Sequence, residues 1–492
     1  MNTEQKDNYD HVLKYTSLFG GVQGLVILIT LVRNKFMALF LGTAGVGFNA
    51  LMTSAQNFAA QCTNLGISFG GVPRLSELYE QQRTDLLHYY IQIIRMWSLI
   101  AACLGFLFSI AISPLVDNLS FNWGNHTLHY ALLALSVAMM AIIGGETAIL
   151  KGTRRLSSLA KIQISTALAS VLVSVPLYYF FSLSGVVPAI VLTAFLTMLV
   201  TLSYSYRCYP LHLRFSRSQF KHGAGMIKLG IAFVLAAAIG SGSEMFIRSF
   251  LNVEGSMDDV GIYNVGYMLT ITYAGMVFSS LESDYFPRLS AVSKDNGQTN
   301  DTVNKQTEVS LLLLAPMLVA LLTMLPVLVP LLFTADFMPV VGMAQVAVLA
   351  MYFKVLTMPI AYITLARSRS LSYLFLETFY FVVLVVAIVC CYRWWGIWGT
   401  GVAIVVAHVA ELVMVGGYAY CQYGFRSTWA IACYAGGQLS IGLTAFVVSL
   451  MAAGWVYWIA EAALTLVSTA YSVSILRQKT HLWEALKRRL RH

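Results

Sequence analysis

Two stretches show how this chain is built: "GGVPRLSEL" at residues 70–78 and "DYFPRLSAV" at residues 284–292. Both contain Pro-Arg-Leu-Ser, which begins at Pro73 in the first copy and at Pro287 in the second. A second match has the same offset, because "VGF" at 46–48 is matched by "VGI" at 260–262. A four-residue match alone recurs by chance in many chains. Two separate matches with the same offset indicate an internal duplication. What is duplicated depends on the solvent around the chain.

The composition is that of a protein embedded in a membrane. Of 492 residues, 58% are apolar and 11% are charged, and the mean hydropathy is +0.71. Soluble domains contain about a quarter charged residues, so this chain has too few charged residues to form a water-exposed surface. Apolar runs of about 20 residues, long enough to cross ~30 Å of hydrocarbon, recur along its length. The sequence predicts an all-α polytopic membrane protein with no sizeable soluble domain and no cleavable signal.

About fourteen transmembrane helices are expected from the apolar runs and their polar breaks. They are placed near 15–41, 45–67, 88–113, 127–150, 157–181, 184–206, 223–248, 260–284, 307–333, 338–362, 370–391, 397–421, 427–453 and 456–476. Lys and Arg accumulate in cytoplasmic loops of membrane proteins. In this chain they gather in every second connection, with Arg393 as the clear exception. This alternation predicts that both termini are cytoplasmic.

The duplication and the topology together predict the domain organisation. Repeats offset by six spans share one orientation, as in transporters built from parallel repeats. We expect an N-terminal six-helix lobe at 1–222 and a C-terminal six-helix lobe at 223–426. Two additional helices follow at 427–476, and a basic cytoplasmic tail occupies 477–492. The two lobes are expected to be pseudo-symmetric, with a ligand site between them.

Three further stretches resemble one family. "RNKFMALFLGTAGVGFNALMTSAQNFAAQCTNLGISFGGVPRLSELY" is similar to the first two helices of Wzx-type oligosaccharide flippases. "ETAILKGTRRLSSLAK" resembles their Lys-Gly-x-(Arg/Lys) loop, and "DDVGIYNVGYMLTITYAGMVFSSLESDYFPRLSAV" resembles their eighth helix and the loop beyond it. By the order and spacing of these stretches, the chain resembles the polysaccharide transporter family of the multidrug/oligosaccharidyl-lipid/polysaccharide exporter superfamily.

The resemblance implies a function and a location. Such proteins move undecaprenyl-pyrophosphate-linked oligosaccharide, an O-antigen or related surface polysaccharide unit, from the cytoplasmic to the periplasmic leaflet by alternating access. It implies a multi-pass protein of the bacterial inner membrane, with polysaccharide polymerase and chain-length proteins as partners. No nucleic acid is expected, because the net charge of +9 is not carried by a solvated basic domain. No cofactor or metal is expected, and the seven cysteines show neither disulfide nor zinc spacing.

Cations inside the membrane are the candidate pyrophosphate ligands, because intramembrane charges are costly and usually face the bundle interior. Arg33 and Lys35 lie in the first helix, and Arg248 lies twelve residues before Val260 in the seventh. Lys354 lies well inside the tenth helix. Alternative roles stay open for all four. The first two are able to snorkel to the surface, Arg248 to pair with Glu244 and Lys354 to pair with Glu377.

Intramembrane acids are the candidates for ion coupling. His408 and Glu411 share one face of a helix at i,i+3, an arrangement that suits a proton or a cation. Glu244 is a further candidate, and Glu146, Glu377 and Glu461 also lie within apolar runs. Polar packing between helices gives the same pattern and is the more frequent reason for it.

Two other functions fit the sequence less well than a flippase. A multidrug antiporter of the same superfamily would favour acids in the first helices, whereas the first helix carries Arg33 and Lys35 and no acid. A membrane oligosaccharide polymerase would need a large periplasmic loop, and the connections on that side are short. Without a Ser-His-Asp, HExxH or phosphate-cradling motif in a suitable loop, we expect no catalytic residue and no enzyme activity.

Overall fold

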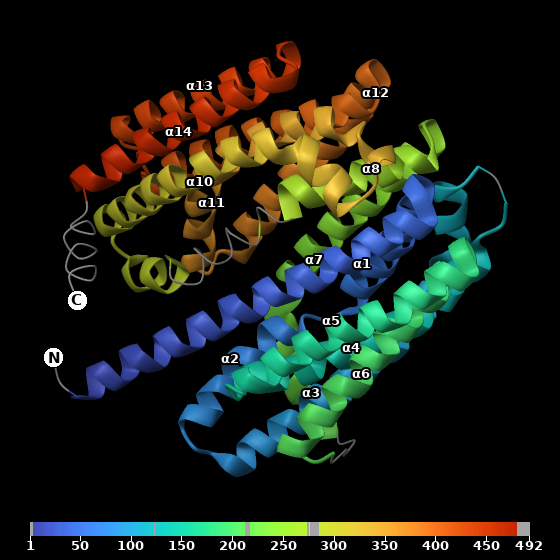
Figure 1. The fold of residues 1–492 in the computed structure, drawn as a ribbon. Helices are drawn as coiled ribbons and strands as arrows, with labels where there is room; N and C mark the ends of the chain where they lie inside the picture. Colours follow the sequence, from blue (N-terminus) through green and yellow to red (C-terminus); the bar gives the residue numbers. More distant parts are fainter. Residues whose placement is uncertain (1–2, 123, 212–216, 273–274, 276–284, 480–492) are drawn as a thin grey trace. The chain divides into compact units, whose positions relative to one another are not determined.

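The regular structure of the chain is helical, as predicted (Figure 1). The computed structural model describes residues 3–122, 124–211, 217–272, 275 and 285–479, and these contain no β-strand. The chain forms two compact units, one of residues 1–261 with 332–334 and one of residues 262–331 with 335–492. The lobe boundary expected at 222–223 and the tail expected at 477–492 stay predictions, and residues 480–492 lie outside the described residues.

The first unit is a helical bundle that ends within α8. Its helices are α1 (Thr3–Thr63), α2 (Ile67–Glu80), α3 (Thr84–Ser120), α4 (Thr127–Gly152), α5 (Leu156–Phe181), α6 (Val186–Cys208), α7 (Arg217–Glu254) and the start of α8 (Met257–Tyr267). A short 3₁₀ turn at Ser182–Gly185 separates α5 from α6.

Besides the rest of α8 and the short helical segments Met268–Thr272 and Ala335–Phe337, the second unit holds the long helices of the C-terminal half. They are α10 (Asn296–Leu332), α11 (Val340–Ala366), α12 (Ser370–Tyr423), α13 (Trp429–Met451) and α14 (Gly454–Lys479). In Figure 1, α13 and α14 run side by side as the red pair at the end of the chain.

Ten helical stretches in the described part of the chain are long and apolar enough to cross a membrane. Three of them each cover two of the predicted spans. The backbone leaves helical geometry at Gly42 within α1 and at Gly396 within α12, and a 3₁₀ turn interrupts the stretch 156–208. The span predicted at 260–284 begins in α8, but residues 276–284 lie outside the described residues. The protein is therefore a multi-pass membrane protein of the expected class.

The duplication is visible in the turns of each unit. Arg154, after α4, and Ser368, after α11, are separated by the same offset as the two Pro-Arg-Leu-Ser copies, and their φ angles are 54° and 55°. Ser182 and Gly396 are related by that offset too, with φ of 49° and 59°. Non-glycine residues seldom adopt this conformation, so its recurrence at one offset is strong evidence for repeated structure. The pseudo-symmetric two-lobe fold was thus correctly predicted.

The repeated Pro-Arg-Leu-Ser supplies a core residue to each unit. Leu75 and Leu289 are both fully buried, each within a cluster of apolar side chains. Leu75 packs so closely on Gly152 that a side chain at that glycine would collide with it. The arginine of the first copy points outward, where Arg74 Nη1 pairs with Glu77 Oε2 at 2.6 Å. This hydrogen bond and the charge of Arg74 lower the pKa of Glu77.

Candidate functional site

Arg33 is a candidate cation with no carboxylate partner among the described residues. It lies on α1 and is half-buried. Its Nη2 donates to Asn34 Oδ1 at 3.3 Å, while its Nε is buried without a hydrogen-bond partner among the described residues. An amide oxygen does not neutralise a guanidinium, so the positive charge of Arg33 persists inside an apolar helix.

Lys35 lies two residues further along α1 and is also half-buried. Its Nζ donates to the backbone carbonyl of Phe333, which belongs to the same compact unit. Residues at i and i+2 of a helix do not face the same side. Arg33 and Lys35 therefore direct their charges to different faces of α1.

Arg248 is paired within its own helix. Its Nη1 lies 3.0 Å from Glu244 Oε2 and 3.2 Å from the Glu244 backbone carbonyl. The Arg248 side chain is 9% exposed and that of Glu244 is 38% exposed, so the pair is accessible from the Glu244 side. This is the intrahelical ion pair that the sequence left open as the alternative to a substrate role.

The second unit brings together three of the predicted residues. Lys354 Nζ, on α11, lies 3.5 Å from Glu411 Oε1, on the second half of α12. His408 Nδ1 lies 2.7 Å from the other oxygen, Oε2. Lys354 thus pairs with Glu411 and not with Glu377, the acid considered from the sequence. One carboxylate joins the predicted substrate lysine to the predicted ion-coupling histidine.

Tyr380 completes this cluster from the first half of α12. Its ring stacks on His408 at 5.0 Å between centroids, and its hydroxyl lies 3.4 Å from His408 Nε2. It also lies under Lys354, whose Nζ is 5.5 Å from the ring centroid. With Nδ1–H donating to Glu411 and Nε2 accepting from Tyr380, a neutral histidine satisfies both contacts. Sequence reasoning missed Tyr380 because 28 residues and the break at Gly396 separate it from His408.

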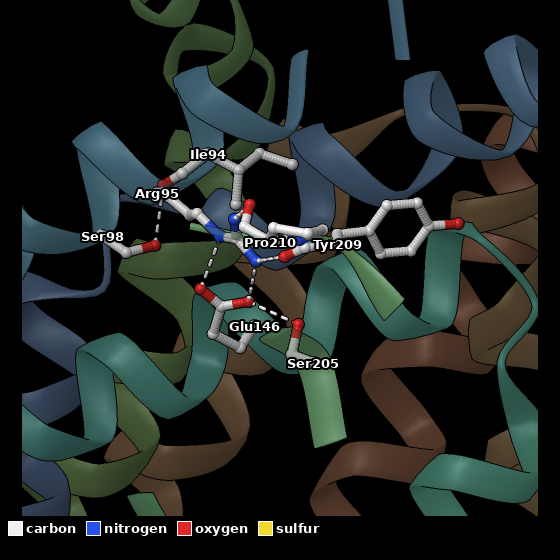
Figure 2. Close-up of polar contacts among 7 residues, drawn as sticks. All are labelled: Ile94, Arg95, Ser98, Glu146, Ser205, Tyr209 and Pro210. Atoms are coloured by element: carbon white, nitrogen blue, oxygen red, sulfur yellow. Dashed lines mark hydrogen bonds and ion pairs between the residues drawn. The ribbon is translucent and has the colours of Figure 1, made fainter. Parts of the chain in front are cut away.

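An ion pair with both side chains buried lies in the first unit, and Figure 2 shows it. Arg95 on α3 binds Glu146 on α4 through two hydrogen bonds, Nε–Oε1 at 2.8 Å and Nη2–Oε2 at 3.1 Å. Ser205 Oγ on α6 donates to Glu146 Oε2 at 2.6 Å. Arg95 also donates to the carbonyls of Tyr209 and Pro210, at 2.8 and 2.9 Å.

The pair of Arg95 and Glu146 is a structural one. Both side chains are only 4% exposed, and each carboxylate oxygen of Glu146 accepts a hydrogen bond. The guanidinium also covers the carbonyls just beyond the end of α6, which lack helical partners there. The pair therefore joins three helices, α3, α4 and α6.

Comparisons with known proteins agree with this architecture. The model of the polysaccharide biosynthesis protein family matches residues 27–342. A search of curated proteins finds no match. Among solved structures, lipid II flippase MurJ in an inward closed conformation aligns with a TM-score of 0.66 at 14% identity, over 94% of this chain and 99% of that chain. An inward-facing multidrug resistance MATE family transporter of the MOP superfamily aligns at 0.64 and 14%, over 81% and 94%.

A MOP superfamily transporter from Pyrococcus furiosus is also similar, with a TM-score of 0.55 and 13% identity over 82% of this chain and 93% of that chain. At such identities the likeness concerns the fold, which is that of the MurJ and MATE transporters. The family match covers well over half of the chain and confirms the resemblance found in the sequence. The chain belongs to the polysaccharide biosynthesis protein family.

Proposed function

We propose that the protein is a flippase for undecaprenyl-pyrophosphate-linked oligosaccharide, an O-antigen or related surface polysaccharide unit. In this proposal it moves the lipid from the cytoplasmic to the periplasmic leaflet of the bacterial inner membrane by alternating access, and it catalyses no covalent chemistry. The family match and the flippase-like fold support a lipid-linked substrate. Both termini lie in the cytoplasm, as the distribution of Lys and Arg indicates.

The observation that carries the proposal is the charge of Arg33. A half-buried guanidinium that pairs with no carboxylate among the described residues suits an anionic ligand. Its unused N–H groups match the paired oxygens of a diphosphate, and it stays charged when partly desolvated. Lys35 adds a second positive charge on α1. Arg248 is paired with Glu244, and the exposed side of Glu244 leaves the arginine able to exchange this carboxylate for an anionic substrate.

The cluster around Glu411 is proposed to couple transport to an ion. Glu411 already holds Lys354 and His408, so a proton or a cation that binds this carboxylate competes with Lys354. Displacing Lys354 leaves this lysine of the second unit able to bind an anionic group of the substrate. Such competition changes the relative stability of two conformations, which is what alternating access requires.

Reconstitution tests the proposal. The purified protein in liposomes should accelerate the exchange between leaflets of a fluorescent undecaprenyl-pyrophosphate oligosaccharide, measured by its accessibility to an impermeant quencher. Protein-free liposomes serve as the control. If the protein instead moves small organic cations against a proton or sodium gradient and leaves the lipid in its leaflet, it is a multidrug antiporter and the proposal is wrong.

A further inference from the structure

Glu461 is a carboxyl group on α14 that plays no part in the proposed transport site. The residue is fully buried, at 0% exposure. Its Oε2 lies 2.9 Å from Thr323 Oγ1 on α10. Its Oε1 is buried with no hydrogen-bond partner among the described residues.

Thr323 offers one hydroxyl proton to two acceptors. Its Oγ1 lies 2.9 Å from the backbone carbonyl of Val319, as well as 2.9 Å from Glu461 Oε2. A hydroxyl has one proton to donate, and a carbonyl is only an acceptor. The hydroxyl proton therefore serves one of these two acceptors at a time, Glu461 Oε2 or the Val319 carbonyl. A protonated Glu461 is able to donate to Thr323 Oγ1 while Thr323 donates to Val319, so the geometry accommodates the acid form.

The surroundings of Glu461 favour the same state. Its helix adds one titratable neighbour, Tyr457, whose hydroxyl donates to the Thr323 carbonyl at 2.8 Å. On α10, Glu308 pairs with Lys479 at 2.6 Å. Glu308 lies about four helical turns before Thr323, roughly 22 Å along the helix axis, which is too far to act on Glu461.

The neighbouring helices supply no counter-charge either. The sequence of α13 contains no charged residue, and its titratable groups are Cys433 and Tyr434. On α11 the one charged residue is Lys354, which pairs with Glu411, and the tyrosines are Tyr352 and Tyr362. Among the described residues, an ionised Glu461 would be a buried charge with a single hydroxyl partner, which is strongly unfavourable.

We infer that Glu461 is a proton-binding site, and that the attachment of α14 to α10 depends on its proton. Tyr457 and Glu461 lie one helical turn apart on α14, and both form a hydrogen bond with Thr323. Thr323 is therefore the point at which α14 is attached to α10. Loss of the proton to water leaves a carboxylate that needs solvation. Deprotonation therefore favours separation of α14 from α10 at Thr323.

Infrared spectroscopy of the protein in lipid membranes tests the protonation state directly. The difference spectrum between the wild type and Glu461→Gln at neutral pH should contain the carbonyl band of a protonated carboxylic acid. In the wild type this band should disappear as the pH is made alkaline. Glu77→Gln is the matched control, because Glu77 is exposed and ionised beside Arg74, and it should lose carboxylate bands only.

Two results would overturn the inference. One is a Glu461→Gln difference spectrum at neutral pH with carboxylate bands and no acid band. If those carboxylate bands also shift with sodium, the site binds a cation instead of a proton.

The second result concerns the attachment of α14 to α10, which is tested by thermal unfolding in detergent. On moving to alkaline pH, the wild type should lose thermal stability relative to Glu461→Gln, whose amide cannot ionise. Parallel pH profiles for the two proteins would show that α14 does not depend on the proton.

Discussion

Gly47 and Gly261 pack against each other, and each is the counterpart of the other in the duplicated sequence. A side chain at Gly47 would collide with the carbonyl of Met257, and one at Gly261 with the carbonyl of Thr43. Thr43 and Met257 are themselves related by the offset of the duplication. The repeated Val-Gly is therefore a reciprocal contact in which both backbones approach too closely for any other residue, as small residues allow in membrane helices.

This contact makes a stability prediction. Gly47→Ala and Gly261→Ala should each destabilise the protein by about 1–3 kcal/mol, because the added methyl group meets backbone that has nowhere to move. Gly144→Ala is the matched control, since its methyl group would meet no atom within 4 Å. It should be neutral or stabilising by about 0.5–1 kcal/mol, the usual effect in a helix. Thermal unfolding in detergent measures all three, and equal effects at Gly47 and Gly144 would refute the close contact.

The ion pair of Arg95 and Glu146 should be sensitive to loss of one partner. Glu146→Ala leaves a buried guanidinium uncompensated and should cost about 3–5 kcal/mol. Arg95→Met combined with Glu146→Leu should recover much of this loss, although the carbonyls of Tyr209 and Pro210 lose their donor. Glu77→Gln, in the exposed pair with Arg74, should change stability little. A double variant no more stable than Glu146→Ala would contradict this account of the pair.

The repeated turn offers a paired test of backbone conformation. Gly396→Ala places a side chain at a φ of 59°, which should cost about 1–2 kcal/mol. Ser182→Gly, at the equivalent turn with a φ of 49°, should be neutral or stabilising because glycine relieves the strain. If Gly396→Ala lowers the unfolding temperature and Ser182→Gly does not, the two turns have equivalent backbone conformations. If both substitutions destabilise the protein, the turns are not equivalent.

The helical class, the duplication and the repeated lobes were predictable from the sequence, because each rests on residues that recur at one spacing or on apolar runs. The partners of the buried charges were not. Arg95 pairs with Glu146 and Lys354 with Glu411, each on a helix other than its own, so only tertiary packing decides which pairs form. Hydropathy identifies a charge within a span, but it contains no information on the face that the charge occupies.

Glu411 provides a test of ion coupling. Glu411→Gln keeps the size and hydrogen bonding of the side chain but removes the charge that holds Lys354, so flipping should persist without dependence on a proton or sodium gradient. Glu411→Asp, which keeps the charge, should retain that dependence at a reduced rate. Initial rates in liposomes with and without an imposed gradient measure the effect. A Gln variant that responds to the gradient like the wild type would exclude Glu411 as the coupling site.

The diphosphate role of Arg33 is the central claim, and one flipping assay tests it most directly. The leaflet exchange of labelled undecaprenyl-pyrophosphate oligosaccharide is compared among the wild type, Arg33→Lys, Arg33→Ala and the double variant Arg33→Ala with Lys35→Ala, all at equal amounts of folded protein. Arg83→Ala is the control, an exposed arginine outside the membrane-spanning helices.

We predict wild-type rates for the control and partial activity for Arg33→Lys, which keeps the charge without the bidentate geometry. Arg33→Ala should lower the rate at least tenfold, about 1.4 kcal/mol or more of lost binding. Unchanged flipping by the double variant would contradict the proposed phosphate site.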